Sequence, residues 1–431
     1  MIEPLTPNTQ AILLLTAPLI AGHGESSREM LTLSEYNRLT RILREKQKQP
    51  ADLIGPDAQD LIELCAQPFG RTRFDALLGR GFLLGQAVEQ WNARAIWVIS
   101  RADSRYPKRL KARLKEDAPP LLYGCGEIGL LEQGGLAVVG SRHVDDELIS
   151  FTENVGRLTA KAHRPVISGG AKGIDRAAMQ GALLADGNVA GVMADSLERA
   201  ALARDNREPL MECRLVLISP YDPAAGFNVG HAMQRNKVIY ALADAGLVVT
   251  SDFEKGGTWT GAIEQLERFH FVPVFVRNGD KAGRGNAALI HHGGRPWPNP
   301  QNAAELGQIL SAAMESVAAE PKQEALPFTL REQPAAYAGS NKPVEPAYVG
   351  GEAPKAILSP AEELFKTVRE IVLRELGVAS LTEAEIVGLL GVTKTQAKEW
   401  LAKLIKEGTV EKVKRTKPVQ YRTSTVSGRL L

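Results

Sequence analysis

The stretch Val138-Val139-Gly140-Ser141-Arg142 ends an apolar run with a glycine, a hydroxyl and a guanidinium. Three more blocks of this kind follow: Ser168-Gly169-Gly170-Ala171-Lys172-Gly173-Ile174-Asp175, Arg235-Asn236-Lys237 and Gly256-Gly257-Thr258-Trp259. Glycine lets a ligand approach the backbone closely, and N–H groups at a helix start attract anions. Together the four blocks predict the capture of phosphate groups.

Short β-branched runs alternate with helical stretches between these blocks, from about residue 95 to residue 300. The predicted strands span residues 96–99, 136–139, 165–167, 189–192, 215–218, 246–249 and 272–276. Continuous apolar runs separated by helices indicate a parallel sheet covered on both faces. The predicted fold class is therefore α/β, a Rossmann-like doubly wound parallel sheet, whose ligands bind beyond the carboxyl ends of the strands.

The regions on either side of the predicted sheet have other patterns. Apolar residues at three-to-four spacing predict an N-terminal helical domain over residues 1–95, followed by the sheet domain over residues 96–317. Residues 318–358 are rich in Pro, Ala, Glu and Gly and predict a flexible linker. Helices followed by an alternating, hairpin-like pattern predict a winged-helix domain over residues 359–424.

Composition limits the classes of function. The 431 residues hold 52 Lys and Arg against 50 Asp and Glu, so a nucleic-acid partner has to be inferred from local patches. The three cysteines lie far apart, which predicts neither a disulfide framework nor a zinc site. No Ser/His/Asp or Cys/His arrangement is present among the scattered histidines. We therefore expect no catalytic residue, no metal and no cofactor.

The apolar run over residues 11–20 is too short to span a bilayer, contains a proline and lacks the basic start of a signal peptide. A buried helix is the better interpretation. We expect a cytoplasmic protein without a membrane contact.

Each of the four blocks also has a purely structural interpretation, in which it binds no ligand. Ser141 is suited to donate to an oxyanion and Arg142 to grip a phosphate with two nitrogens, although the same residues also make an ordinary turn. Asn236 is expected to tie the loop backbone together while Arg235 or Lys237 meets the ligand; a solvated face is the alternative.

The remaining two blocks each follow a strand and begin a helix. In the first, Gly169, Gly170 and Gly173 are expected to wrap an anion, with Lys172 as a point charge. Asp175 is expected to cap or orient that loop, because a carboxylate beside a phosphate is repelled. In the second block, Gly256, Gly257 and Thr258 suit anion binding, and Trp259 is either a base-stacking platform or a core residue.

The blocks, taken in order, resemble the DprA/Smf family of DNA-processing proteins over roughly residues 99–297. The resemblance includes the lead-in Asp103-Ser104-Arg105-Tyr106-Pro107 and the closing Gly285-Asn286-Ala287-Ala288-Leu289. It implies a Rossmann-like fold that binds single-stranded DNA, dimerises and delivers a RecA-type recombinase in natural transformation. The contacts that it implies are Arg142, Ser168, Gly169, Lys172, Arg235 and Lys237. Met179 stands where the family usually has histidine, which indicates a divergent branch.

The predicted winged helix is basic. Residues 391–422 hold nine cations and three anions. A local excess of this size fits phosphate neutralisation and predicts contact with duplex DNA. The expected contacts are Lys394, Lys398, Lys403, Lys414 and Arg415.

We therefore expect a DNA-binding protein that is not an enzyme, and two alternatives remain. Gly256-Gly257-Thr258 with Glu264 resembles a loop of the nucleotide phosphoribohydrolases, although Lys255 replaces its proline. A nucleotide-sensing module that signals through the winged helix is the second alternative. The sequence leaves open whether the cellular task is transformation, repair or defence against foreign DNA.

Overall fold

The computed structural model describes residues 4–19, 30–226, 228–279 and 282–319, and then shorter segments: 369, 372–376, 380–390, 397, 400–401, 404–405, 407, 409–413 and 420–423. The chain divides into two units, residues 1–328 and 329–431.

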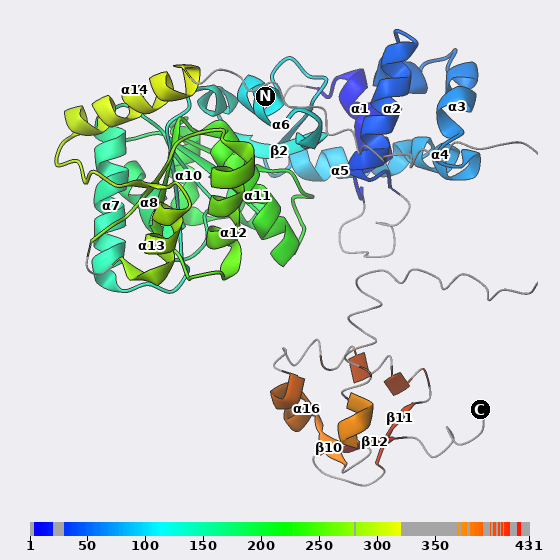
Figure 1. The fold of residues 1–431 in the computed structure, drawn as a ribbon. Helices are drawn as coiled ribbons and strands as arrows, with labels where there is room; N and C mark the ends of the chain where they lie inside the picture. Colours follow the sequence, from blue (N-terminus) through cyan, green and yellow to red (C-terminus); the bar gives the residue numbers. More distant parts are fainter. Residues whose placement is uncertain are drawn as a thin grey trace, which may run out of the picture. The chain divides into compact units, whose positions relative to one another are not determined.

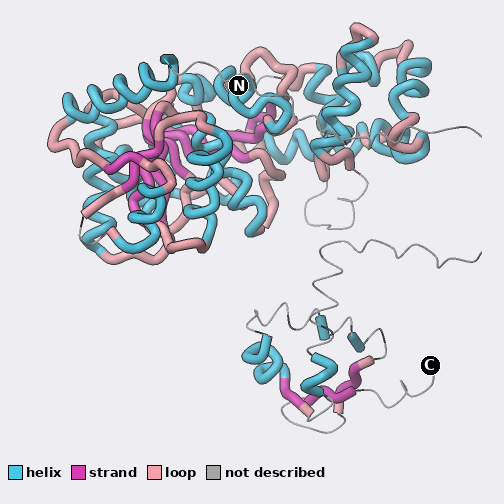
Figure 2. The backbone as a smooth tube through the Cα atoms, viewed as in Figure 1, coloured by secondary structure: helices cyan, strands magenta, loops and turns pink. Residues whose placement is uncertain are grey.

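A nine-stranded sheet forms the centre of the larger unit, in the order β1-β2-β6-β5-β4-β3-β7-β8-β9 (Figure 2). The strands are β1 (Trp97–Ser100), β2 (Leu121–Gly126), β3 (Leu136–Gly140), β4 (Val166–Ser168), β5 (Val189–Val192), β6 (Leu215–Ser219), β7 (Ala245–Thr250), β8 (Val274–Val276) and β9 (Arg295–Pro296). All seven predicted runs form strands, so the α/β class is confirmed.

The sheet is mixed, whereas the sequence predicts a wholly parallel one. Strand β2 pairs antiparallel with both β1 and β6, while the pairs from β6 to β9 are parallel. Strand β2 was not among the predicted strands because two of its six residues are glycines, which disfavour strands. A Cβ on Gly124 would lie 2.5 Å from the ring of Trp97, so this glycine makes room for cross-strand packing.

Helices cover both faces of the sheet (Figure 1). They are α6 (Lys108–Leu114), α7 (Asp146–Lys161), α8 (Ile174–Leu183), α9 (Leu197–Leu202), α10 (Arg204–Met211), α11 (Val229–Leu242), α12 (Gly256–Glu264), α13 (Gly283–His291) and α14 (Ala303–Ala319). One core contains residues of α7, α8 and α14, and a second core contains residues of α6, α11 and α13. Successive residues of β3 alternate between the two cores, as expected for a strand with both faces buried.

The N-terminal helices are α1 (Pro7–Thr16), α2 (Leu33–Glu45), α3 (Gln59–Ala66), α4 (Arg71–Leu78) and α5 (Gly81–Asn92). The predicted buried helix is confirmed in α1, whose residues Ala11 to Leu15 are at most 5% exposed. Part of this region has its own core around Leu39 and Phe74, whereas Ile12 and Trp91 belong to one of the two sheet cores. The domain boundaries given above remain predictions.

Short helical segments complete the larger unit: η2 (Pro50–Ile54), η3 (Lys115–Asp117), η4 (Ile128–Glu132) and the π-helical η5 (Gln265–Phe269). None of the helices described in the structure is long and apolar enough to cross a membrane.

The smaller unit contains β10 (Leu381–Thr382), α16 (Glu383–Leu390), β11 (Val410–Lys412) and β12 (Gln420–Thr423). Its strands form an antiparallel sheet in the order β10-β12-β11. Val372, Ile386 and Tyr421 are among the residues of its core. The hairpin of β11 and β12 overlaps the stretch 410–421 for which the sequence predicts a hairpin, and the winged-helix assignment remains a prediction.

Candidate nucleic-acid interface

A cavity of about 480 Å³ lies in the larger unit, where β3 ends and α12 begins. Its wall comes from the loop after β3, the first part of α11, the start of α12 and the loop before α8. Eight of the residues that the sequence predicts as phosphate contacts line this cavity: Gly140, Ser141, Arg142, Arg235, Asn236, Gly256, Gly257 and Thr258. The cavity thus brings together three of the four blocks with Ala171 and Asp175 of the fourth.

The loop after β3 is held by its neighbours. A Cβ on Gly140 would lie 2.5 Å from Ile174, so glycine permits the start of α8 to pack against the strand end. Thr258 Oγ1 donates to the Gly140 carbonyl at 3.0 Å and thereby ties α12 to this loop. Arg142 is exposed and lines the cavity.

The start of α12 is the open side of the site. Gly256 has φ +79°, and a Cβ built on it would meet no atom within 4 Å. The first N–H groups of a helix have no partner within the helix and carry the positive end of its dipole. Asn236 Nδ2 donates to the Gly257 carbonyl at 2.8 Å, which fits the expectation that this asparagine ties loop backbone. The α12 start therefore offers anion-binding groups to the cavity.

Arg235 lies within α11 and is only 6% exposed. Its Nη1 donates to the Val192 carbonyl at 3.1 Å, and its Nη2 pairs with Asp175 Oδ2 at 3.3 Å. Its Nε is buried without a hydrogen-bond partner in the described part of the chain. Two of its three nitrogens are therefore engaged internally, and the carboxylate of Asp175, which also lines the cavity, offsets the charge of Arg235.

Asp175 occupies the first turn of α8 and is 4% exposed. It accepts hydrogen bonds from the backbone of Ala171 and Gly140 as well as from Arg235. Burial raises the pKa of this carboxyl, and the charge of Arg235 opposes the rise. These contacts fit the expected role of Asp175 in orienting the loop.

The block from Ser168 to Gly173 is the one that the cavity largely leaves out. Ser168 is buried, and its hydroxyl donates to the Val138 carbonyl at 2.6 Å. A Cβ on Gly169 would lie 1.0 Å from Arg235 Nη1, and one on Gly173 would lie 2.6 Å from the Ser141 carbonyl. Gly170 has φ +66°, and Lys172 is exposed; neither lines the cavity. The glycines of this block make room for protein atoms.

The Arg235-Asn236-Lys237 block lies inside α11, whereas the sequence places it before a helix. Two positions along a helix correspond to about 200°, so Arg235 and Lys237 project to nearly opposite sides. The Lys237 ammonium lies 5.3 Å from the centre of the Phe269 ring, and this lysine is absent from the cavity wall.

Four polar residues of the wall were not predicted as contacts: His143, Asp175, Asp252 and Lys255. Lys255 is exposed and is the N-cap residue of α12. The signal in the sequence that could have found it is its place directly before Gly256, where the sequence predicts the start of a helix. Trp259 is partly buried and makes edge contacts with Phe253 and His292, so both of its interpretations stay open.

The predicted winged-helix contacts Lys394, Lys398, Lys403, Lys414 and Arg415 lie outside the described residues. Within the described residues, no group of three or more His, Cys, Asp or Glu is arranged to hold a metal ion.

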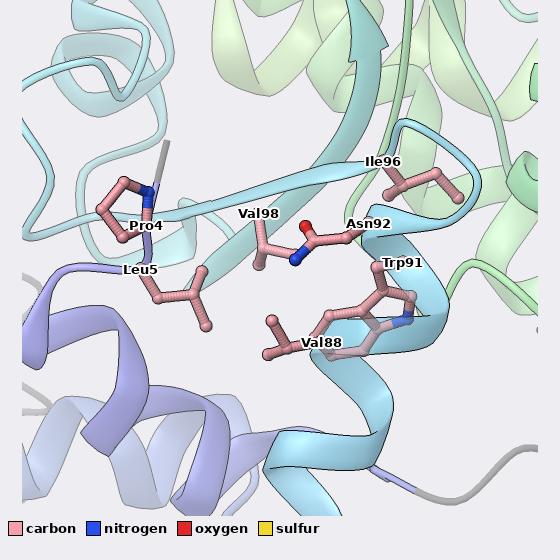
Figure 3. Close-up of a pocket in the computed structure, with 7 residues that line it drawn as sticks. All are labelled: Pro4, Leu5, Val88, Trp91, Asn92, Ile96 and Val98. Atoms are coloured by element: carbon pink, nitrogen blue, oxygen red, sulfur yellow. The ribbon is translucent and has the colours of Figure 1, made fainter. Parts of the chain in front are cut away.

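A second cavity, of about 240 Å³, lies between the N-terminal residues, α5 and β1 (Figure 3). It is lined by Pro4, Leu5, Val88, Trp91, Asn92, Ile96 and Val98. Its lining, among the residues that the structure describes, is mostly apolar and contains no cation.

Residues 97–306 match the family model described as DNA recombination-mediator protein A. This part of the chain belongs to the DprA/Smf family. DprA of Bacillus subtilis is 25% identical over 188 residues, which cover 43% of this chain and 62% of that protein. Protein Smf of Synechocystis is 25% identical over 200 residues, covering 44% of this chain and 50% of its own length.

The chain thus spans between one half and two thirds of the length of these curated DprA/Smf relatives. The X-ray structure of DprA from Streptococcus pneumoniae superposes with a TM-score of 0.52 at 20% identity, covering 70% of this chain and 98% of that one. At this identity the likeness establishes a shared fold. The predicted family and fold class are confirmed, and residues 97–306 are similar to distant members of the DprA/Smf family.

Proposed function

We propose that the larger unit binds single-stranded DNA by its phosphates and does so in the cavity described above. The observation that carries the proposal is the convergence of Arg142, Lys255 and Arg235 with the open start of α12 around one cavity. Guanidinium groups and helix N-termini are the usual protein partners of phosphate oxygens. Membership of the DprA/Smf family supports a role in DNA processing.

The size of the cavity favours one strand over two. A volume of about 480 Å³ accommodates a part of a nucleotide chain but not the width of a duplex. Its cations and the start of α12 are suited to bind phosphates, which carry no sequence information. Binding is therefore expected to depend on salt and to be nearly independent of base sequence.

A phosphoribohydrolase-like activity has less support. In the resembling loop the carboxylate that would act beside the sugar is Glu264, and Glu264 is not among the residues of the cavity wall, whose carboxylates are Asp175 and Asp252. We propose that the protein is a binder that acts in recombination and delivers a RecA-type recombinase to the strand, as the family resemblance implies. We propose on the basis of the same family resemblance that the protein forms a homodimer.

For the smaller unit we propose a winged helix that strengthens binding to DNA with a duplex part. The support is the basic segment over residues 391–422 together with the small antiparallel sheet. When one unit already holds the DNA, a second binding unit on the same chain meets that DNA at a raised effective concentration. Deleting residues 359–431 should weaken binding to a tailed duplex much more than binding to a plain oligonucleotide. Equal losses on both substrates would contradict a separate duplex contact.

The test of the central proposal is the affinity for single strands of unrelated sequence, measured over a range of salt concentrations. Arg142→Ala is compared with Arg157→Ala, which removes an exposed arginine from α7. We expect only the first variant to weaken binding to every sequence. Competition by nucleoside monophosphates and an assay for released base distinguish strand binding from nucleotide sensing and from hydrolysis.

A further inference from the structure

A second basic surface lies where α2 of the N-terminal helices meets the segment that joins β1 to β2. We define this junction surface by Arg38, Arg41, Arg44, Arg101 and Lys111, grouped about Glu116. None of these six residues contributes to the cavity described above. The cations come from parts of the chain that are about 60 residues apart and that the fold brings together.

Hydrogen bonds hold the two parts in place. Arg41 Nη2 pairs with Glu116 Oε2 at 2.9 Å, and Asn37 Nδ2 donates to the Glu116 carbonyl at 2.9 Å. Arg101 Nη1 donates to the same carbonyl at 3.1 Å, and Arg101 Nη2 donates to Asn37 Oδ1 at 2.7 Å. Lys111 Nζ donates to the Arg101 carbonyl at 3.1 Å. The arrangement is therefore fixed by the fold.

Neutralisation of this surface is incomplete. Glu116 interacts with Arg41, Arg101 and Arg44 together, which lower the pKa of its carboxyl. Arg38 stands one turn before Arg41 on α2 and is exposed, as is Arg44 one turn after it. Residues 36–48 hold five cations and one anion, and residues 108–117 hold five cations and two anions. A chain with a formal net charge of +2 thus concentrates positive charge here.

Part of the charge on α6 has a structural use. Arg109 Nη1 pairs with the buried Asp244 at 2.6 Å, and Arg113 Nη1 donates to the Ala241 and Ala243 carbonyls at the end of α11. These two arginines are left out of the junction surface for this reason. Within the junction surface, Arg41 and Arg101 are engaged with Glu116 and Asn37. The cations that face an external anion are therefore chiefly the exposed Arg38, Arg44 and Lys111.

We propose that the junction surface is a second contact for the phosphate backbone of nucleic acid, used by strands that extend beyond the cavity. Its cations are mostly arginines, whose planar guanidinium groups match phosphate oxygens. Strand β1 ends beside the surface: Ser100 pairs with Leu121 of β2, and Tyr123 of β2 pairs with Ser219, the last residue of β6. The surface therefore lies at the end of the sheet where β6 terminates. Strand β3 terminates at the same end of the sheet, in the cavity wall.

Charge complementarity favours a polyanion of regular spacing over a protein partner. The defined cations are not accompanied by an exposed apolar side chain of the kind that anchors a protein interface: the exposed large apolar residues of the described chain include Leu33 on α2 but none between Tyr36 and Arg44. The inference rests on the proposed function in one respect, namely that a short oligonucleotide occupies the cavity.

The experiment compares two triple variants of the full chain. The first is Arg38→Gln, Arg44→Gln and Lys111→Gln, which leaves the Arg41–Glu116 pair in place. The matched control is Arg157→Gln, Lys161→Gln and Arg207→Gln, which removes as much charge from exposed positions of α7 and α10. Thermal unfolding of each variant checks that the fold is kept.

The measurement is the salt dependence of binding to oligonucleotides of about 6 and about 30 nucleotides, of which the first lies within the range of typical single-strand sites and the second well beyond it. With each lost phosphate contact worth about 0.7 in the log–log slope, the first variant should lower the slope for the long strand by up to about 2. Its binding to the short strand and all binding by the control should stay unchanged.

Three results would overturn the junction proposal. They are an unchanged slope for the long strand, an equal loss on both lengths, and a loss confined to an acidic polypeptide such as polyglutamate. The outcome is separable from that of the cavity. If Arg142→Ala binds single strands normally while the junction variant is weakened on the long strand, the cavity proposal fails and the junction proposal stands.

Discussion

Two glycine-containing blocks with the same expected role have different surroundings. In the block from Ser168 to Gly173, a Cβ on Gly169 would overlap the Arg235 guanidinium. At the start of α12, a Cβ on Gly256 would meet no atom within 4 Å, and one on Gly257 would meet Asn236 only at 3.8 Å. Glycine in the first block makes room for the protein, whereas glycine in the second leaves space for a ligand.

The comparison shows what a phosphate-like motif leaves undetermined. Glycines next to a strand end allow a close approach to the backbone, but a side chain of the same protein is as able to make that approach as a phosphate is. In the first block, the approaching group is the guanidinium of Arg235, which the sequence predicts as a ligand contact. Arg235, itself a predicted phosphate contact, thus fills the space beside Gly169 in which the sequence predicts a phosphate.

The largest expected effect is that of Gly169→Ala. The added methyl group would overlap Arg235 Nη1, so the guanidinium has to leave its contacts with Asp175 and Val192. Overpacking of this kind typically costs about 1–3 kcal/mol of stability. Chemical denaturation measures the loss.

The control for Gly169→Ala is Gly85→Ala on α5, where a Cβ meets no atom within 4 Å and alanine favours the helix. Equal stability of Gly169→Ala and Gly85→Ala would contradict the tight packing of Arg235 over the loop.

Arg142→Ala is expected to act on binding and hardly on folding, because Arg142 is exposed on the cavity wall. A hydrogen bond to a charged group contributes about 1.5–3 kcal/mol, so the affinity for single strands should fall by roughly 10- to 100-fold at low salt. Titration of a labelled oligonucleotide measures the change. A loss of stability that accounts for the weaker binding would count against a direct contact.

Most of the fold could be predicted from the sequence, because buried parallel strands leave continuous apolar runs such as Val189–Val192. Strand β2 was missed since Gly124 and Gly126 weaken its pattern, and their use against Trp97 and Leu215 exists only in the folded chain. Such a contact between distant residues has no local signal.

The site could be predicted in part. Residues next to the end of β3 and the start of α12 line the cavity as expected, because strand ends and helix starts are local features. The relative direction of two nearby side chains depends on whether both residues lie within a helix. The sequence places the start of the helix after Lys237, whereas α11 begins at Val229, so the opposite directions of Arg235 and Lys237 were not foreseen.

Gly257→Ala is expected to have small effects of opposite sign. The residue lies in the first turn of α12, and a Cβ there meets Asn236 and Met233 at ordinary contact distances of 3.8 and 4.0 Å. Alanine should therefore raise stability by about 0.4–1 kcal/mol through the unfolded chain. The methyl group faces the cavity wall and should weaken strand binding by less than Arg142→Ala does. Thermal unfolding and oligonucleotide titration on the same sample measure both changes.

The smallest expected effect is that of Lys172→Ala, compared with Lys255→Ala. Both lysines are exposed and next to glycines, but only Lys255 lines the cavity. Loss of Lys255 should lower the log–log salt slope for single strands by about 0.7, and loss of Lys172 should leave the slope unchanged, because a lysine outside the cavity neutralises no bound phosphate. Both variants lose one positive charge, so a general weakening of attraction to DNA affects them alike. A slope change for Lys172→Ala as large as that for Lys255→Ala would mean that the strand runs over the Ser168–Gly173 block as well, and the distinction between a packed block and an open block would then fail as a guide to the binding site.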